Sequence, residues 1–145
     1  MGSAYYDYRE RKIVAVLTTG IEAPIALNVI GHLSIAIGAF KDEHLMGQRT
    51  IEDGSGIPHM GISRYPFIIT HAKQGKLRMA IEKARSINGV YLADYPRQML
   101  TTGHEEELIA EMKLLKEEEI EYLGAIFYGP TEEINTITGK FSLWK

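Results

Sequence analysis

Apolar positions along the chain fall into short continuous runs and segments with helical spacing. Residues 12–18 (KIVAVLT) form a β-branched, apolar run with little alternation, which is typical of a strand covered on both faces. A Thr-Thr-Gly turn ends this run, and Pro24 then stands where a helix can begin. In the following segment, an apolar stripe recurs at every fourth residue: Ile25, Val29, Leu33 and Ile37. The pattern predicts a buried strand and then a helix buried on most sides.

The middle of the chain repeats this alternation. Residues 67–70 (FIIT) predict a second strand, residues 76–87 a helix that ends at Asn88-Gly89, and residues 90–93 a third strand. Strand, helix and strand at this spacing imply a parallel crossover.

Three stretches lie outside the alternation. Residues 1–11 are a lead-in to the first strand. Residues 41–66 are rich in Gly, Asp, Ser and His, with a turn cluster at their centre, and predict a long loop or a small hairpin. Residues 95–119 are an insertion, and its second part, 103–119, predicts a strongly charged surface helix.

The end of the chain, residues 124–145, combines a strand, a short helix and a last strand. An apolar and aromatic run ends at Gly129-Pro130, where the proline can occupy the first helical position. Two glutamates follow in the first turn, and Thr138-Gly139 ends the helix before a final strand at residues 141–144. The chain is therefore expected to end inside the fold.

These elements together predict an α/β fold, in which residues 1–145 form a single domain. We expect a three-layer sandwich: a mixed, mainly parallel sheet of four or five strands with helices on both faces. The 145 residues, 45% hydrophobic and 24% charged, suit one globular domain with a sizeable core.

Composition narrows the functional classes. The absence of cysteine excludes disulfides and thiolate nucleophiles, and the first residues do not resemble a signal peptide, so we expect a cytoplasmic protein. Residues 21–40 are long enough to span a membrane, but Glu22, Asn28 and His32 interrupt them. A buried helix without a membrane partner is the better interpretation.

Asn28 and His32 are the best candidate pair for a site. They stand four residues apart, so their side chains project from the same face of a mostly apolar or small-residue helix. Burying an amide and an imidazole without partners costs about 1–3 kcal/mol each. Two explanations remain open: a hydrogen-bonded core pair that fixes the helix, or a contact with a ligand.

Further candidates stand near predicted element ends. Asp94 follows the third strand, where carboxylates of open α/β sheets often face a ligand crevice, although an Asx-type turn explains it equally well. Thr102 and Glu105 have the spacing of a capping box around His104. The five histidines lack the paired spacing of a zinc motif, and no phosphate-binding or nucleotide-binding glycine motif occurs. We expect neither a metal nor a cofactor.

Three segments, residues 12–38, 67–94 and 124–143, resemble the superfamily of type II peptidyl-tRNA hydrolases. The helix motif ALNV, the TGH segment and the ending GPTEEINTITGKFSLW are similar to those of an uncharacterised family within that superfamily. The resemblance implies the sandwich fold and a homodimer. It also matches His32, Asp94 and Thr138 to functional positions of the hydrolases.

The resemblance also shows what this chain lacks. The hydrolases have an arginine and an aspartate after the first strand, and a lysine and a glutamine on the first helix. Here the matching positions are Thr18, Gly20, Ile25 and Val29. An isoleucine can neither bind a phosphate nor donate a proton, so the resemblance implies a cleft whose chemistry has changed.

Three functional hypotheses follow. The first is a hydrolase-like enzyme with a changed site, with the catalytic residues His32, Asp94 and His104 and the ligand contacts Asn28, Thr102 and Thr138. The second is a non-catalytic, homodimeric domain that binds a small molecule or a nucleotide. The third is an assembly protein that functions through its dimer interface. A tRNA partner is disfavoured by the missing lysine and the net charge of −3.

Overall fold

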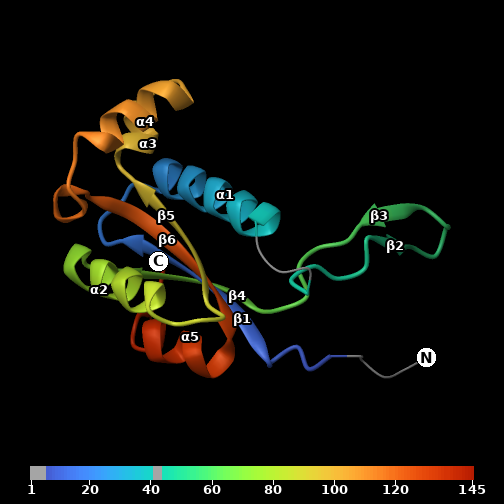
Figure 1. Ribbon diagram of the computed structural model, residues 1–145. Helices are drawn as coiled ribbons and strands as arrows, with labels where there is room; N and C mark the ends of the chain where they lie inside the picture. Colours follow the sequence, from blue (N-terminus) through green and yellow to red (C-terminus); the bar gives the residue numbers. More distant parts are fainter. Residues whose placement is uncertain (1–5, 41–43) are drawn as a thin grey trace.

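A computed structural model of the chain describes residues 6–40 and 44–145 (Figure 1). The central sheet has five strands in the order β5-β6-β1-β4-β7. Its strands are β1 (Arg11–Thr18), β4 (Phe67–Ala72), β5 (Tyr91–Pro96), β6 (Tyr122–Pro130) and β7 (Ser142–Leu143). The helices are α1 (Ala23–Phe40), α2 (Gln74–Arg85), α3 (Gln98–Thr101), α4 (Glu105–Lys113), the 3₁₀ turn η1 (Glu117–Glu119) and α5 (Thr131–Thr138).

The sheet is mixed but mostly antiparallel, which corrects the prediction of a mainly parallel sheet. Only β1 and β4 pair in parallel, whereas β5 with β6, β6 with β1, and β4 with β7 pair antiparallel. The crossover from β4 through α2 to β5 does join strands that point the same way. However, β6 returns antiparallel between β5 and β1, so the crossover strands are not neighbours.

Helices cover both faces of the sheet. On one face, α1 packs its buried residues against β1, β5 and β6, and on the other face α2 and α5 pack together (Figure 1). The strand β6 is buried at eight of its nine positions because both layers cover it. The α/β sandwich is therefore as expected, with two cores separated by the sheet.

The two irregular stretches contain short elements, and a small hairpin was one of the two structures expected for the first stretch. Residues 44–66 contain a hairpin of β2 (Thr50–Glu52) and β3 (Pro58–Met60), while residues 41–43 lie outside the described part. The predicted helix 103–119 is two elements, because α4 ends at Lys113 and η1 follows.

Two predicted helix starts also differ by a few residues. The predicted capping box is not formed: His104 is the residue before α4, and the Thr102 hydroxyl instead donates to the carbonyl of Gln98 at 2.8 Å. Pro130 ends β6 in an extended conformation, with φ −56° and ψ 138°, so α5 begins one residue later at Thr131. Both starts depend on the path of the preceding chain, which local spacing does not define.

Candidate functional site

Asn28 and His32 lie together on the exposed side of α1, and not in the core. The Tyr95 hydroxyl, from β5, donates a hydrogen bond to Asn28 Oδ1 at 3.2 Å. The rings of Tyr95 and His32 lie 6.1 Å apart between centroids, in a tilted arrangement. The partner of the pair is thus a tyrosine that the sequence did not single out.

Asp94 lies on the opposite face of the sheet from Asn28 and His32. It neighbours Tyr95 on β5, and successive side chains of a strand point to opposite faces. Its carboxylate lies 3.5 Å from the Arg85 guanidinium of α2. Burial raises the pKa of Asp94, and the positive charge of Arg85 opposes that rise. The sheet therefore separates Asp94 from His32.

The remaining predicted residues do not complete a single site either. Thr138 is buried on α5, and its hydroxyl donates to the carbonyl of Ile134 one turn earlier, at 3.1 Å. Thr102 and His104 belong to the connection between α3 and α4, and His104 is exposed. The six residues lie on both sides of the sheet, and their individual roles stay predictions.

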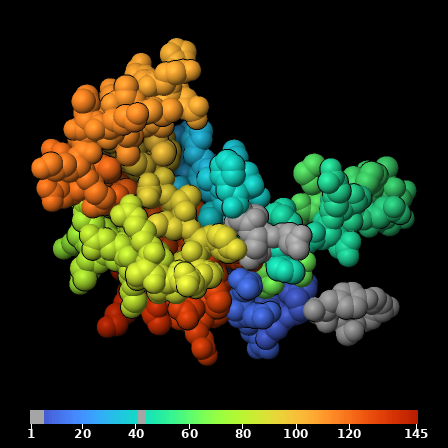
Figure 2. All heavy atoms as spheres, viewed as in Figure 1, coloured from blue at the N-terminus to red at the C-terminus, as the bar shows by residue number. Residues whose placement is uncertain are grey.

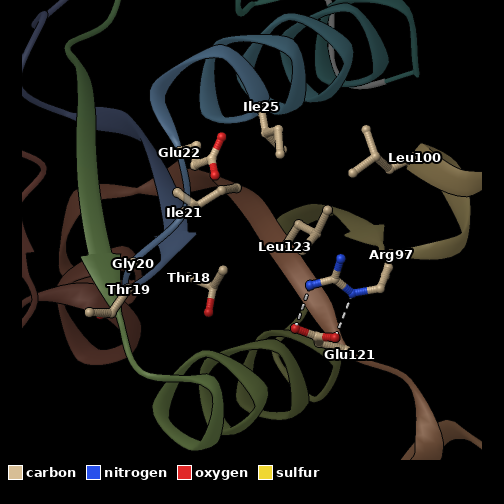
Figure 3. A pocket seen from close by; sticks show the side chains of 10 residues that line it. All are labelled: Thr18, Thr19, Gly20, Ile21, Glu22, Ile25, Arg97, Leu100, Glu121 and Leu123. Carbon is tan, nitrogen blue, oxygen red and sulfur yellow. Dashed lines mark hydrogen bonds and ion pairs between the residues drawn. The ribbon is translucent and has the colours of Figure 1, made fainter.

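A pocket of about 240 Å³ lies at the edge of the sheet where β1 ends (Figure 3). Its wall combines apolar, hydroxyl and charged side chains. It is lined by Thr18, Thr19, Gly20, Ile21, Glu22, Ile25, Arg97, Leu100, Glu121 and Leu123. These residues come from the β1–α1 turn, the first turn of α1, the end of β5, α3 and the start of β6.

The sheet directions bring these segments together. Since β1 and β5 point the same way, both end at this edge, and the antiparallel β6 begins there. Gly20 makes the turn from β1 to α1 with φ +87°, a conformation that side chains with a Cβ rarely adopt. On one side, the Gln74 amide group of α2 donates to Thr18 Oγ1 at 3.2 Å and to the carbonyl of Tyr122 at 2.7 Å. The pocket wall is therefore held by hydrogen bonds between elements.

An ion pair forms one wall of the pocket. Arg97 donates to both carboxylate oxygens of Glu121, from Nε at 2.6 Å and from Nη2 at 2.9 Å (Figure 3). The hydrogen bond from Arg97 lowers the pKa of Glu121, and the same bond raises the pKa of Arg97. Glu22, in contrast, has no hydrogen bond or ion pair from its carboxylate within the described part of the chain. With Arg97 and Glu121 neutralising each other, the pocket keeps one negative charge.

Only some of the residues that line the pocket were singled out in the sequence. Three of the positions matched to polar hydrolase residues, Thr18, Gly20 and Ile25, line it, whereas Val29 is fully buried in the core. Glu22, Arg97 and Glu121 were missed as site residues. The pairing of Pro96 with Tyr122 places Arg97 beside Glu121, and sequence spacing alone carries no signal for this pairing.

Two further features concern metal binding and membranes. Among residues 6–40 and 44–145, no three His, Cys, Asp or Glu side chains converge as a metal site would require. In the same residues, α1 is the one helix long and apolar enough to cross a membrane, judged by length and composition. Its side chains Ala26, Val29, Leu33 and Ile37 are buried in the first core.

The fold and the pocket together define an α/β sandwich domain with a small cleft at the edge of its sheet. Residues 11–145 match the family described as "Protein of unknown function (DUF2000)", and the chain belongs to that family. Its fold is similar to that of Atu0240, a protein of unknown function from Agrobacterium tumefaciens strain C58. That similarity has a TM-score of 0.79 at 19% sequence identity and covers 94% of this chain and 98% of the other. No curated protein matches the chain.

Proposed function

We propose that the protein is a non-catalytic binding domain, and that a small molecule occupies the pocket at the end of β1. The observation that carries the proposal is the pocket wall itself. Apolar side chains, Ile25, Leu100 and Leu123, stand beside a fixed ion pair and a carboxylate without a partner. Pockets with an apolar lining and a few placed polar groups are typical of small-molecule sites.

The charge of the pocket defines the kind of ligand. Because Arg97 is bound to Glu121, the carboxylate of Glu22 is the group left to bind a ligand through a charge. A primary amine with a small apolar body suits this wall, since the ammonium group can donate to Glu22 while the body packs on Ile25 and Leu123. A volume of about 240 Å³ is below the usual range for drug-sized ligands, about 300–1,000 Å³, which disfavours a whole nucleotide.

A hydrolase is less well supported. No histidine lines the pocket, and Asp94 and His32 lie on opposite faces of the sheet. Membership of the type II peptidyl-tRNA hydrolase superfamily remains part of our proposal. Its support is that Thr18, Gly20 and Ile25, matched through the resemblance to that enzyme's polar positions, surround the same pocket. A retained cleft with altered chemistry fits a binding role.

Titration with phenethylamine, followed by NMR spectroscopy of the amide groups, tests the proposal. We expect shifts to concentrate at Gly20, Leu100 and Leu123, and 2-phenylethanol and phenylacetate to bind more weakly. Glu22→Gln should weaken amine binding about tenfold through loss of a charge-assisted hydrogen bond. Glu82→Gln, which removes an exposed carboxylate from α2, should leave it unchanged. Equal or tighter binding of phenylacetate, or shifts outside the pocket, would contradict the proposal.

A further inference from the structure

A second and larger hollow lies between α2 and α5, on the face of the sheet opposite α1. One wall is formed by α2, and the other by the last turn of α5 and the residues after it. In Figure 2 the atoms of α5, in red, lie directly beneath those of α2, in yellow-green. The hollow has a volume of about 810 Å³, within the ~300–1,000 Å³ of typical ligand sites. We call it the α2–α5 groove.

The floor of the groove is apolar. On α2, Met79 and Ala80 stand three and four residues after Lys76, so the three side chains share one face of the helix. Ile137 of α5 and Phe141 just beyond that helix complete the apolar lining. Ala80 and Ile137 are only 4% and 7% exposed, whereas Met79 is 60% exposed. The apolar surface is therefore recessed, and a flexible methionine at its side can pack on a bound apolar chain.

The charged side chains around this floor are mostly lysines. Three of them line the groove, Lys76, Lys83 and Lys140, against one carboxylate. With Glu82 as that carboxylate, the formal charge of the groove is +2, although the whole chain carries −3. The ammonium groups of Lys76 and Lys140 have no hydrogen bond or ion pair within residues 6–40 and 44–145. Lys83 Nζ donates to the carbonyl oxygen of Thr136 at 3.0 Å, which holds its charge beside α5 and leaves two N–H donors free.

We infer that the α2–α5 groove binds a free amphipathic anion, a small molecule with one acidic group on an apolar chain. The chain lies on the floor, over Met79 and Ile137, and the acidic group accepts hydrogen bonds from the lysines around it. This inference is independent of the amine proposed for the pocket at the end of β1, because that pocket lies at the edge of the sheet and has its own lining residues.

Both parts of the ligand are needed to match the groove. A neutral ligand would remove water from the ammonium groups without supplying a counter-charge, which costs free energy. An anionic group instead forms charge-assisted hydrogen bonds with them. A small inorganic anion, on the other hand, would leave the apolar floor uncovered, and burial of that floor is favourable. An acidic group joined to an apolar chain satisfies the lysines and the floor together.

A membrane surface fits these features less well than a free molecule. Helices that lie in a membrane interface place an apolar face into the lipid. The apolar face of α2, with Leu77, Ile81 and Ala84, packs instead in the second core against the sheet. The recessed floor of the groove likewise cannot reach into a bilayer, whereas a free chain can enter it.

Titration of the whole chain with octanoate, followed by NMR spectroscopy of the amide groups, tests the inference. At up to about 5 mM octanoate, we expect saturable shifts concentrated at Ala80, Lys83, Gly139 and Phe141. 1-Octanol, which lacks the charge, should bind about threefold more weakly or worse. Butanoate has a shorter apolar chain and should bind at least about tenfold more weakly, because each buried methylene group adds to the hydrophobic free energy. Phenethylamine should not shift these amides.

Variants of exposed lysines separate the charge of the groove from the charge of the whole chain. Lys140→Gln should weaken octanoate binding about threefold, and Lys76→Gln combined with Lys140→Gln about tenfold. Neither ammonium group has a partner in the described part of the chain, so both variants should be as stable as the wild type. The matched control, Lys113→Gln, removes an exposed lysine at the end of α4 and should leave binding unchanged. Glu82→Gln should tighten octanoate binding about twofold and leave phenethylamine binding unchanged.

The inference fails if octanoate shifts no amide in this concentration range, or shifts only those of the pocket at the end of β1. It also fails if 1-octanol binds as tightly as octanoate, or if the double lysine variant binds octanoate as tightly as the wild type. Sedimentation with phosphatidylserine vesicles, without shifts from octanoate, would assign the lysines to a membrane surface instead. Because the amine and the anion are followed at different amides, failure of one proposal is distinguishable from failure of the other.

Discussion

Replacement of Gly124 by alanine is expected to destabilise the protein by about 1–3 kcal/mol, the usual cost of overpacking a core. A Cβ at Gly124 of β6 would lie 2.9 Å from Val29 Cγ1 and 3.0 Å from the carbonyl oxygen of Val16. Val29 is fully buried, and its β-branched side chain has few alternative rotamers. The backbone of β1 cannot yield alone, so α1 must move away from the sheet. Urea unfolding followed by circular dichroism measures the loss.

The matched control is the same change at a glycine with free space. A Cβ at Gly75, in the first turn of α2, would meet nothing within 4 Å. Because alanine favours a helix over glycine by up to ~1 kcal/mol, Gly75→Ala should be neutral or stabilising. If Gly124→Ala and Gly75→Ala lowered the free energy of unfolding equally, the close packing of α1 on β6 would not explain the effect of Gly124→Ala.

The local elements of this fold could be predicted, whereas the direction of β6 could not. The apolar run that became β1 and the four-residue spacing of α1 are local signals, and both elements begin within a residue of their predicted starts. The apolar pattern of β6 shows that it is buried on both faces, but a buried strand has the same pattern in either direction. The antiparallel direction of β6 therefore could not be predicted from the sequence pattern.

The candidate site was only partly predictable for the same reason. The spacing of Asn28 and His32 correctly placed both side chains on one side of α1. It could not show that this side is exposed or that Tyr95 is the partner, because a tertiary contact decides both. Asp94 was predicted to follow the third strand, but it lies within β5 (Tyr91–Pro96), and the strand register turns its side chain toward α2.

A second test of stability concerns the charged side chains that connect α2, η1 and the start of β6. The Tyr122 hydroxyl donates to Glu117 at 2.6 Å and accepts from Arg85 at 3.1 Å, and the Arg78 guanidinium lies 5.2 Å from the Tyr122 ring centroid. Arg78 also donates to Glu117 at 2.9 Å. Only 1% of Tyr122 is exposed. The tyrosine therefore connects two arginines and a carboxylate through a buried ring at the start of β6.

Tyr122→Phe should destabilise the protein by about 1–2 kcal/mol at neutral pH, because it removes a hydroxyl that bonds to two charged groups. We place the loss at the lower end of values for such bonds, since the side chain of Glu117 is 42% exposed and water screens its charge. The benzene ring keeps its volume, so no cavity adds to the loss. Urea unfolding at pH 7 measures it.

The pH dependence distinguishes this cause from a general packing defect. The hydrogen bond from Tyr122 is the main reason that the pKa of Glu117 is lowered. A carboxylate with a lowered pKa stabilises the fold above its ordinary pKa, and that stabilisation disappears as the pH falls through the folded-state value. The gap between wild type and Tyr122→Phe should thus be largest near neutral pH and shrink below about pH 4.

The matched control is Tyr91→Phe. Tyr91 stacks on Tyr128 with ring centroids 5.8 Å apart, and its hydroxyl has no hydrogen bond within the described part of the chain. This variant should change stability little, and equally at every pH. A gap for Tyr122→Phe that stayed constant from pH 7 to about pH 3 would show that the hydroxyl does not act through Glu117. The stabilising contribution of the Tyr122 hydroxyl would then come from its other hydrogen bond, the one that it accepts from Arg85.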